Sequence, residues 1–256
     1  MPRSNRALHK RRNVTATARP WAPPGPPPQD LAPVWLFDLD DTLHNATARI
    51  MPLVNRLMSA FVAAELGVDT PTADAIRHRY WLRYGATLLG MVDQHRVAPQ
   101  RFLQATHPMA ELGPLVRRDP RLIAMLRRLR GRKIILTNAP HHYATEVLLR
   151  LGIHGLVDHL IPIEAMQLAG QLRPKPSRSM LRALLARHRL SASRCILVED
   201  SLPNLAAARA VGLRTVFIHG FHRGAGRRPR QLAGPGRRVA MQLASSHQLA
   251  RLRLRR

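Results

Sequence analysis

Acidic side chains are concentrated directly after a short apolar run in this 256-residue chain. Residues 37–43 read FDLDDTL, and the run that leads into them, residues 34–37, reads VWLF. Asp38 and Asp40 are two positions apart, so on an extended chain their carboxylates point the same way and can meet one ligand. One carboxylate of such a pair can attack phosphorus while the other transfers a proton. We expect Asp41, the next residue, to be a turn or helix-cap residue.

Polar residues also follow two later apolar segments and a proline-flanked loop position. The segments KIILTNA (residues 133–139) and RCILVEDS (residues 194–201) have the apolar and β-branched composition that is typical of strands. Because ligands bind outside the carboxyl ends of the strands in parallel α/β sheets, we expect the polar groups to converge with Asp38 and Asp40. These groups are a hydroxyl, an amide, two carboxylates and an ammonium: Thr137, Asn138, Glu199, Asp200 and Lys175.

The carboxylates of this set are suited to a hard divalent cation. Mg²⁺ prefers oxygen ligands and is usually held by one or two carboxylates together with phosphate and water. Asp38, Glu199 and Asp200 can supply such ligands, and the cation would offset repulsion among the acids and a bound phosphate. A hydroxyl, an amide and an ammonium can hold the charged oxygens of a phosphoryl group. We therefore predict Mg²⁺ as the cofactor and Thr137, Asn138 and Lys175 as the phosphate-binding residues.

The elements expected around these residues alternate between strands and helices. A buried strand over residues 34–38 precedes a helical block from Ile50 to about Pro114, in which apolar residues recur at steps of three and four. Further strands are expected within residues 133–139, 156–165, 194–201 and 214–220, separated by helices within residues 119–133, 141–153, 176–190 and 204–213. This alternation implies right-handed crossovers. We predict an α/β fold with a doubly wound, Rossmann-like parallel sheet and a helical cap inserted after the first strand.

The chain divides into four kinds of segment by composition and pattern. Residues 1–30 contain RPWAPPGPPPQD, which predicts a disordered, basic, Pro-rich arm. The α/β core is expected over residues 31–46 and 115–220, and the helical cap over residues 47–114. Residues 221–256 form a basic C-terminal segment, in which an edge strand and a helix are expected near residues 239–252.

The positive charge of the chain is partly concentrated in its two flanks. The formal net charge is +26, and residues 221–256 carry ten Arg and no acidic residue. A nucleic-acid contact through these basic flanks is one interpretation. The flanks lack interleaved aromatic residues and known nucleic-acid motifs, so we favour solvated basic segments.

No apolar run approaches the ~20 residues that cross a bilayer, and the N-terminus has no apolar signal-peptide region. The single Cys excludes an intrachain disulfide, which fits a reducing compartment. We therefore expect a cytoplasmic protein without a membrane partner. An Arg-rich N-terminus is also typical of a transit peptide, and that alternative stays open.

Four short motifs, in this order, resemble those of the haloacid dehalogenase superfamily: FDLDDTL, ILTN, RPKP and LVEDS. The resemblance covers about residues 33–220. It implies that Asp38 is the nucleophile and Asp40 the general acid/base. It also implies that Thr137 and Lys175 bind phosphate, and that Glu199 and Asp200 bind Mg²⁺ together with Asp38 and the main-chain carbonyl of Asp40.

The acid at position 40 separates two branches of that superfamily. The dehalogenase branch lacks an acid there, because a departing halide needs no proton. Asp40 therefore favours a phosphate ester as the substrate.

The region of the cap around residues 80–90 is similar to the pyrimidine 5′-nucleotidase subgroup, in which a Tyr-x-x-Tyr-Gly-x-Thr-Leu-x-Gly pattern recurs. The segment YWLRYGATLLG carries most of that pattern. An aromatic side chain there could stack on a flat base. The substrate-contact candidates are Tyr80, Arg83, Tyr84 and Thr87. Aromatic residues at helical spacing are more often the core of a helical block, and this alternative stays open.

The sequence thus predicts a Mg²⁺-dependent phosphatase that forms an aspartyl phosphate, with a pyrimidine nucleoside 5′-monophosphate such as UMP or CMP as the favoured small-molecule substrate. Another small phosphoester, such as a sugar phosphate or phosphoglycolate, is the first alternative. A nucleic-acid-associated protein on an inactive phosphatase scaffold is the second. Base preference, rates, oligomeric state and pathway are not readable from the sequence.

Overall fold

Strand β1 (Val34–Phe37) lies in the middle of a parallel sheet. The computed structural model describes residues 32–221 and 241–251, and within them six strands form this sheet in the order β3-β2-β1-β6-β7-β8. All neighbouring strands pair in parallel. The other strands of the sheet are β2 (Arg132–Leu136), β3 (His159–Ile161), β6 (Cys195–Glu199), β7 (Arg214–Ile218) and β8 (Met241–Leu243).

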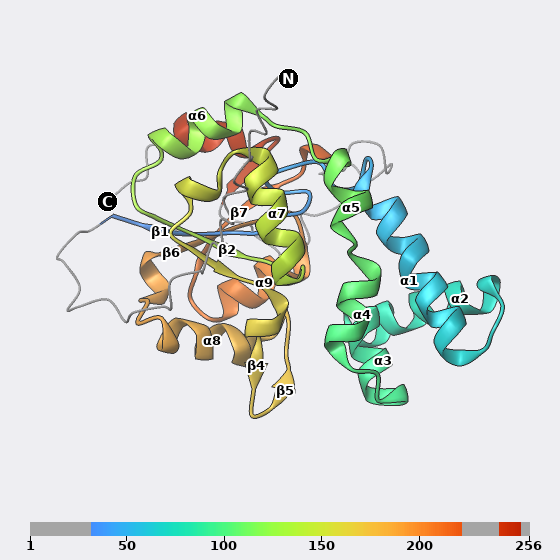
Figure 1. Cartoon of the computed structure of the whole chain (residues 1–256). Helices are drawn as coiled ribbons and strands as arrows, with labels where there is room; N and C mark the ends of the chain where they lie inside the picture. Colours follow the sequence, from blue (N-terminus) through green and yellow to red (C-terminus); the bar gives the residue numbers. More distant parts are fainter. Residues whose placement is uncertain (1–31, 222–240, 252–256) are drawn as a thin grey trace, which may run out of the picture. The chain divides into compact units, whose positions relative to one another are not determined.

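The side chains of β1 alternate between two hydrophobic clusters, as expected for a strand buried on both faces. Trp35 and Phe37 pack in a cluster with residues of α6 (Pro120–Arg128) and α7 (His141–Leu151). Val34 and Leu36 pack in a second cluster with residues of α8 (Arg178–Arg187) and α9 (Leu202–Ala210). Figure 1 shows the two helix pairs on opposite faces of the sheet. The predicted doubly wound α/β fold is confirmed.

A helical segment follows β1 before the chain returns to the sheet, which confirms the predicted insertion (Figure 1). Gly67 and Gly85, both with positive φ, end its first two helices in the left-handed conformation that glycine adopts without strain. The side chain of Asp69 accepts a hydrogen bond from the Thr72 amide and begins the second helix. The elements are α1 (Ile50–Leu66), α2 (Thr70–Tyr84), α3 (Thr87–His95), α4 (Pro99–Thr106), α5 (Met109–Leu112) and the 3₁₀ helix η1 (Gly113–Leu115).

The inserted helices share a hydrophobic cluster that includes Tyr80, Met91 and Phe102. Tyr80 is buried, and its hydroxyl lies 2.6 Å from His95 Nε2. The ring lies against Gly90 of α3, so closely that a Cβ atom at position 90 would overlap it. Glycine at this position therefore allows α2 and α3 to approach each other.

A short antiparallel hairpin, β4 (Gln167–Leu168) with β5 (Gln171–Leu172), precedes α8 and was not predicted, because two-residue strands give no readable periodicity. Near the C-terminus, the edge strand β8 pairs with β7 and leads to a 3₁₀ helix, η7 (Ser246–Arg251). The predicted arm over residues 1–30 and residues 222–240 of the basic C-terminal segment lie outside the described residues. Further 3₁₀ helices are η2 (His154–Leu156), η3 (Ile163–Ala165) and η4 (Ala192–Arg194).

Within the described ranges, no single helix has both the length and the apolar character needed to cross a bilayer. Helices α1 and α2 meet that criterion only when taken together, and the chain bends by 108° between them.

We expect Gly90→Ala to destabilise the protein although alanine favours helix by about 1 kcal/mol over glycine. The new methyl group would meet the buried Tyr80 ring, which the contact with His95 holds in place. Overpacking of this kind lowers the free energy of unfolding by about 1–3 kcal/mol, and thermal denaturation should show a fall in Tm of several degrees. Gly155→Ala is the control, since nothing lies within 4 Å of a Cβ at that position. Equal Tm values for the two variants would contradict the packing argument.

Candidate active site

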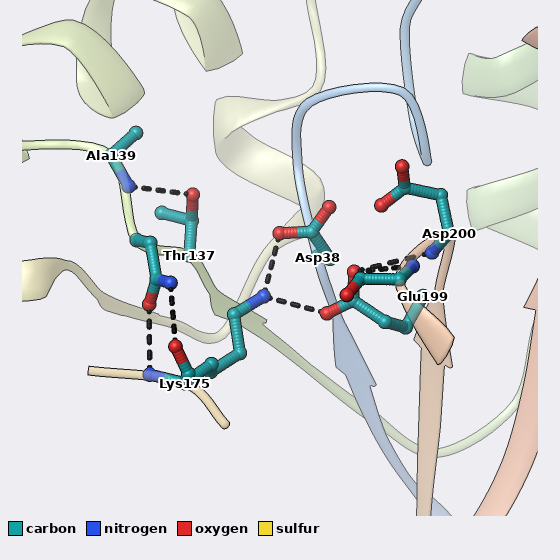
Figure 2. A network of polar contacts seen from close by, with 8 residues as sticks. Asp38, Thr137, Ala139, Lys175, Glu199 and Asp200 are labelled. Carbon is teal, nitrogen blue, oxygen red and sulfur yellow. Dashed lines mark hydrogen bonds and ion pairs between the residues drawn. The ribbon is translucent and has the colours of Figure 1, made fainter. Parts of the chain in front are cut away.

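A buried ammonium group links the carboxyl ends of two neighbouring strands. Lys175 Nζ donates hydrogen bonds to Asp38 Oδ1 and to Glu199 Oε2, both at 2.7 Å (Figure 2). The exposed fractions of Asp38, Lys175 and Glu199 are 6%, 3% and 1%. Since buried charges are stable only when they are paired, the three groups depend on one another for burial.

The sheet itself brings the two carboxylates together. Phe37 of β1 is in register with Val198 of β6, and the Asp38 amide continues that ladder to the Val198 carbonyl at 3.0 Å. Asp38 therefore follows the last residue of β1 beside Glu199, the last residue of β6. Strand β1 lies between β2 and β6, where the chain order of the sheet reverses, and such points are the ligand sites of doubly wound folds.

The side chain of Asn138 holds the backbone of the loop that carries Lys175. Its Oδ1 accepts from the Lys175 amide and its Nδ2 donates to the Lys175 carbonyl, both at 3.0 Å. Thr137, directly after β2, is buried, and its Oγ1 accepts from the Ala139 amide at 3.0 Å. The Thr137 hydroxyl proton remains available to an acceptor such as a phosphoryl oxygen.

Asp38, Glu199 and Asp200 form a group that could hold a metal ion. Each offers a carboxylate oxygen, and these oxygens lie within 4.8 Å of one another. Figure 2 shows Asp200 on the side of Asp38 that faces away from Thr137. Three carboxylates beside one ammonium leave an excess of negative charge in a mostly buried place. The donor set and its charge both fit Mg²⁺.

Burial and the excess of negative charge both raise the pKa values of Asp38 and Glu199. Burial, and then repulsion from Glu199, raises the pKa of Asp38 to about 7, although Lys175 opposes the rise. Burial likewise raises the pKa of Glu199 to about 7. Burial lowers the pKa of Lys175, but Asp38 and Glu199 outweigh it, so the pKa is raised overall and the ammonium stays protonated.

Asp40 lies in a different environment, and sequence reasoning missed the residues that create it. Its Oδ1 is 2.6 Å from the Tyr143 hydroxyl, which donates, and 2.9 Å from His44 Nε2. Burial raises the pKa of Asp40, but the hydrogen bonds from His44 and Tyr143 outweigh it, so the pKa lies below its ordinary value. The one signal in the sequence was the scarcity of tyrosine, since the chain has three.

Asp41 is the turn residue that the sequence predicts. Its φ of 57° is in the left-handed region, and its carboxylate accepts from the Thr47 amide at 2.8 Å and from the Thr47 hydroxyl. The carboxylate of Asp41 is thus engaged within the loop.

The four substrate-contact candidates in the inserted helices lie in different surroundings. Tyr80 belongs to the core of these helices, and the buried Thr87 hydroxyl donates to the Arg77 carbonyl. Arg83 is exposed, with its guanidinium over the Tyr84 ring at 5.4 Å from the centroid. Tyr84, half-buried, lines a cavity of about 860 Å³ that is bordered by α3, α4 and the β4–β5 hairpin. Of the four, Tyr84 alone borders this cavity.

A family model described as haloacid dehalogenase-like hydrolase matches residues 34–212. The chain is similar to Phosphate metabolism protein 8 of Saccharomyces cerevisiae, with 24% identity over 144 residues. That match covers 52% of this chain and 44% of the relative, so the chain matches less than half the length of the yeast protein.

The fold is similar to two solved structures at low sequence identity. One is the haloacid dehalogenase-like family protein SP0104 from Streptococcus pneumoniae, with a TM-score of 0.56 and 18% identity over 86% of this chain and 97% of the other. The second is YfnB from Bacillus subtilis, a putative hydrolase of the same type bound to magnesium, with a TM-score of 0.56 and 13% identity over the same shares. At these identities the likeness concerns the fold.

We expect the thermal stability of metal-free Asp38→Asn, relative to the wild type, to increase as pH rises. The pKa of Asp38 is raised from 3.8 to about 7, so the folded protein holds this proton more tightly than the unfolded chain does. Stability is therefore lost as pH rises from 3.8 to about 7, and Asn lacks this loss. The readout is the difference in Tm between variant and wild type in a chelator, at about pH 5 and about pH 8.

Mg²⁺ should stabilise the wild type more than Asp38→Asn, which lacks one of the three carboxylates that could hold the ion. Asp119→Asn is the matched control, because Asp119 caps α6 and contacts His247 outside this cluster. Its response to Mg²⁺ should equal that of the wild type. A difference between Asp38→Asn and wild type that does not change with pH would contradict the prediction.

Proposed function

This chain belongs to the haloacid dehalogenase-like hydrolases, and we propose that its activity is the Mg²⁺-dependent hydrolysis of a phosphate monoester. The observation that carries the proposal is the environment of the two acids in FDLDDTL. Asp38 shares Lys175 with Glu199 beside a possible metal site, whereas Asp40 has separate hydrogen-bond donors. One acid is thus arranged for attack and the other for proton transfer.

In the proposed reaction, a carboxylate oxygen of Asp38 attacks phosphorus and the bond from phosphorus to the ester oxygen breaks. The negative charge of the bound phosphate would raise the pKa of Asp40, against the effect of its donors, so that Asp40 holds a proton. Asp40 gives that proton to the departing oxygen, and an aspartyl phosphate remains on Asp38. Asp40 then takes a proton from water, and the water oxygen attacks phosphorus and breaks the bond to Asp38.

The other residues of the cluster hold the charged groups in place. Lys175 and the Thr137 hydroxyl would donate to the phosphoryl oxygens. Asp38, Glu199, Asp200 and the Asp40 carbonyl would hold the cation. Mg²⁺, when bound, would neutralise charge on the acids and the phosphoryl group.

A phosphate ester suits Asp40 better than a halide does. A departing alkoxide needs a proton and a halide does not, so a held carboxyl group at this place has a task only in ester hydrolysis. The name of the yeast relative, Phosphate metabolism protein 8, agrees with a phosphoester substrate.

For the leaving group, we propose a pyrimidine nucleoside such as that of UMP or CMP. The support is the resemblance of the segment YWLRYGATLLG to the pyrimidine 5′-nucleotidase pattern, and the position of Tyr84 at the edge of the cavity between α3, α4 and the hairpin. An aromatic ring there can stack on a base, which contributes about 1–3 kcal/mol. A sugar phosphate or phosphoglycolate is the alternative substrate.

The activity is tested by measuring phosphate release from a panel of esters with and without Mg²⁺. The panel contains UMP, CMP, their deoxy forms, AMP, glucose 6-phosphate and phosphoglycolate. We expect metal-dependent release from UMP and CMP, and its loss by more than about 10³-fold in Asp38→Asn, which lacks the nucleophile. Release only from the other esters would retain the mechanism and exclude the pyrimidine substrate. If the protein released phosphate from none of the esters, the proposed phosphatase activity would be excluded.

We expect Tyr84→Ala to raise KM for UMP by about tenfold, because it removes a stacking surface, with little change in kcat. Inhibition by inorganic phosphate, which has no base, should be unchanged. Trp81→Ala is the control, since Trp81 lies on the same helix, is 55% exposed and does not line the cavity. If Tyr84→Ala and Trp81→Ala had the same KM for UMP, the base would not bind against Tyr84.

A further inference from the structure

Both donors that reach the Asp40 side chain contact the same oxygen. The Tyr143 hydroxyl and His44 Nε2 lie 2.6 Å and 2.9 Å from Oδ1. Within the described residues, Oδ2 accepts no hydrogen bond, and the Asp40 side chain is 20% exposed while that of His44 is 7% exposed. The carboxyl group is therefore held through Oδ1, while no donor among the described residues reaches Oδ2.

Tyr143 is held firmly enough to fix the direction of that hydrogen bond. It is fully buried in the first turn of α7. The edge of one ring meets the face of the other where Tyr143 contacts His107, with centroids 5.4 Å apart and planes at 70°. The backbone of His107 is also held in place, because its main-chain carbonyl accepts a hydrogen bond from His142 Nε2 at 2.9 Å. Burial lowers the pKa of His107 to about 4, so it packs as a neutral ring.

His44 is held by the turn that follows β1. The Leu43 amide donates to the Leu39 carbonyl at 2.9 Å, and the backbone of His44 forms a bridge with that of Asp40. Asp41 closes the same loop through Thr47. The His44 ring therefore approaches Asp40 from its own loop, whereas Tyr143 approaches from a helix 103 residues later in the sequence.

We infer that Tyr143 and His44 are positioning residues that fix the Asp40 carboxyl through Oδ1, so that Oδ2 is the oxygen that exchanges the proton with the leaving group and with water. An oxygen that already accepts two hydrogen bonds has its lone pairs engaged, which leaves the mobile proton to the other oxygen. This inference rests on the proposed phosphatase function and names residues that act in it through Asp40.

A positioning role and a merely structural role predict different substrate dependence. A nucleoside alkoxide leaves poorly without a proton, whereas p-nitrophenolate leaves without one. Misplacing the Asp40 carboxyl should slow the first reaction and spare formation of the aspartyl phosphate in the second. Loss of folded protein would reduce both rates equally.

The test compares kcat for UMP and for p-nitrophenyl phosphate in Tyr143→Phe, which removes one hydroxyl from a buried ring. The first turnover of p-nitrophenyl phosphate is followed as a burst of p-nitrophenolate, because that step needs no proton from Asp40. We expect kcat for UMP to fall by about 10- to 100-fold while KM stays near the wild-type value. The burst rate should fall by less than about threefold.

A pair of His44 variants gives a second, independent readout. Gln at position 44 can place an amide donor near the position of Nε2, whereas Leu has a similar size and no donor. We expect His44→Gln to retain most of the UMP turnover that His44→Leu loses. His247→Leu is the matched control, because His247 pairs with Asp119 at 2.7 Å outside this cluster and its loss should leave both rates unchanged.

Equal losses of both rates in Tyr143→Phe, or no loss in either, would overturn the inference while leaving the phosphatase proposal intact. Equal turnover by His44→Gln and His44→Leu would overturn the role of His44. A wild-type protein that releases phosphate from neither ester would overturn the proposed function and the positioning role together.

Discussion

The carboxylates of Asp38 and Glu199 and the ammonium of Lys175 lie together in a place that excludes most water. This buried cluster constrains how the surrounding elements are arranged. Asp38 and Glu199 end adjacent strands, so the parallel pairing of β1 with β6 that builds the sheet also forces two like charges together. Lys175 compensates them from a loop that is distant in sequence, and Asn138 fixes that loop to the end of β2. The pairing of β1 with β6 and the Lys175 ammonium thus depend on each other, because removing one partner of a buried ion pair leaves the other charge uncompensated.

The segment FDLDDTL, residues 37–43, contains two acids whose pKa values are shifted in opposite directions. Repulsion and burial raise the pKa of Asp38, whereas donors on Oδ1 lower the pKa of Asp40. In the metal-free protein these shifts oppose the proposed roles, because attack needs an ionised Asp38 and proton donation needs a protonated Asp40. Bound Mg²⁺ would lower the pKa of Asp38, and the charge of a bound phosphate would raise that of Asp40. The difference between the two pKa shifts arises from the neighbours of each acid in the folded protein and not from their spacing in the sequence. Asp38 lies beside β6, and Asp40 lies beside the first turn of α7.

The strands, the helical insertion and the convergence of Asp38, Lys175 and Glu199 could be predicted from sequence because each depends on local pattern and one topological rule. Tyr143 could not, since its contact with Asp40 spans 103 positions and a Tyr at the third position of a helix has many possible surroundings. Tyr80 shows the converse limit. The pattern that suggested a substrate contact is equally well satisfied by a ring buried against Gly90. The β4–β5 hairpin could not be predicted, because its two-residue strands are too short to show an alternation of apolar and polar residues.

The hydrogen bonds around Asn138 also bear on how this protein ages. Deamidation of asparagine begins when the amide nitrogen of the next residue attacks the side-chain carbonyl carbon. Here the Ala139 amide is engaged with Thr137 Oγ1, and the Asn138 side chain is aligned with the backbone of Lys175 at both its oxygen and its nitrogen. Conversion to Asp would remove the donor to the Lys175 carbonyl and add a carboxylate beside Thr137. The contacts that fix the lysine loop therefore also disfavour the spontaneous chemical change that would disturb it most.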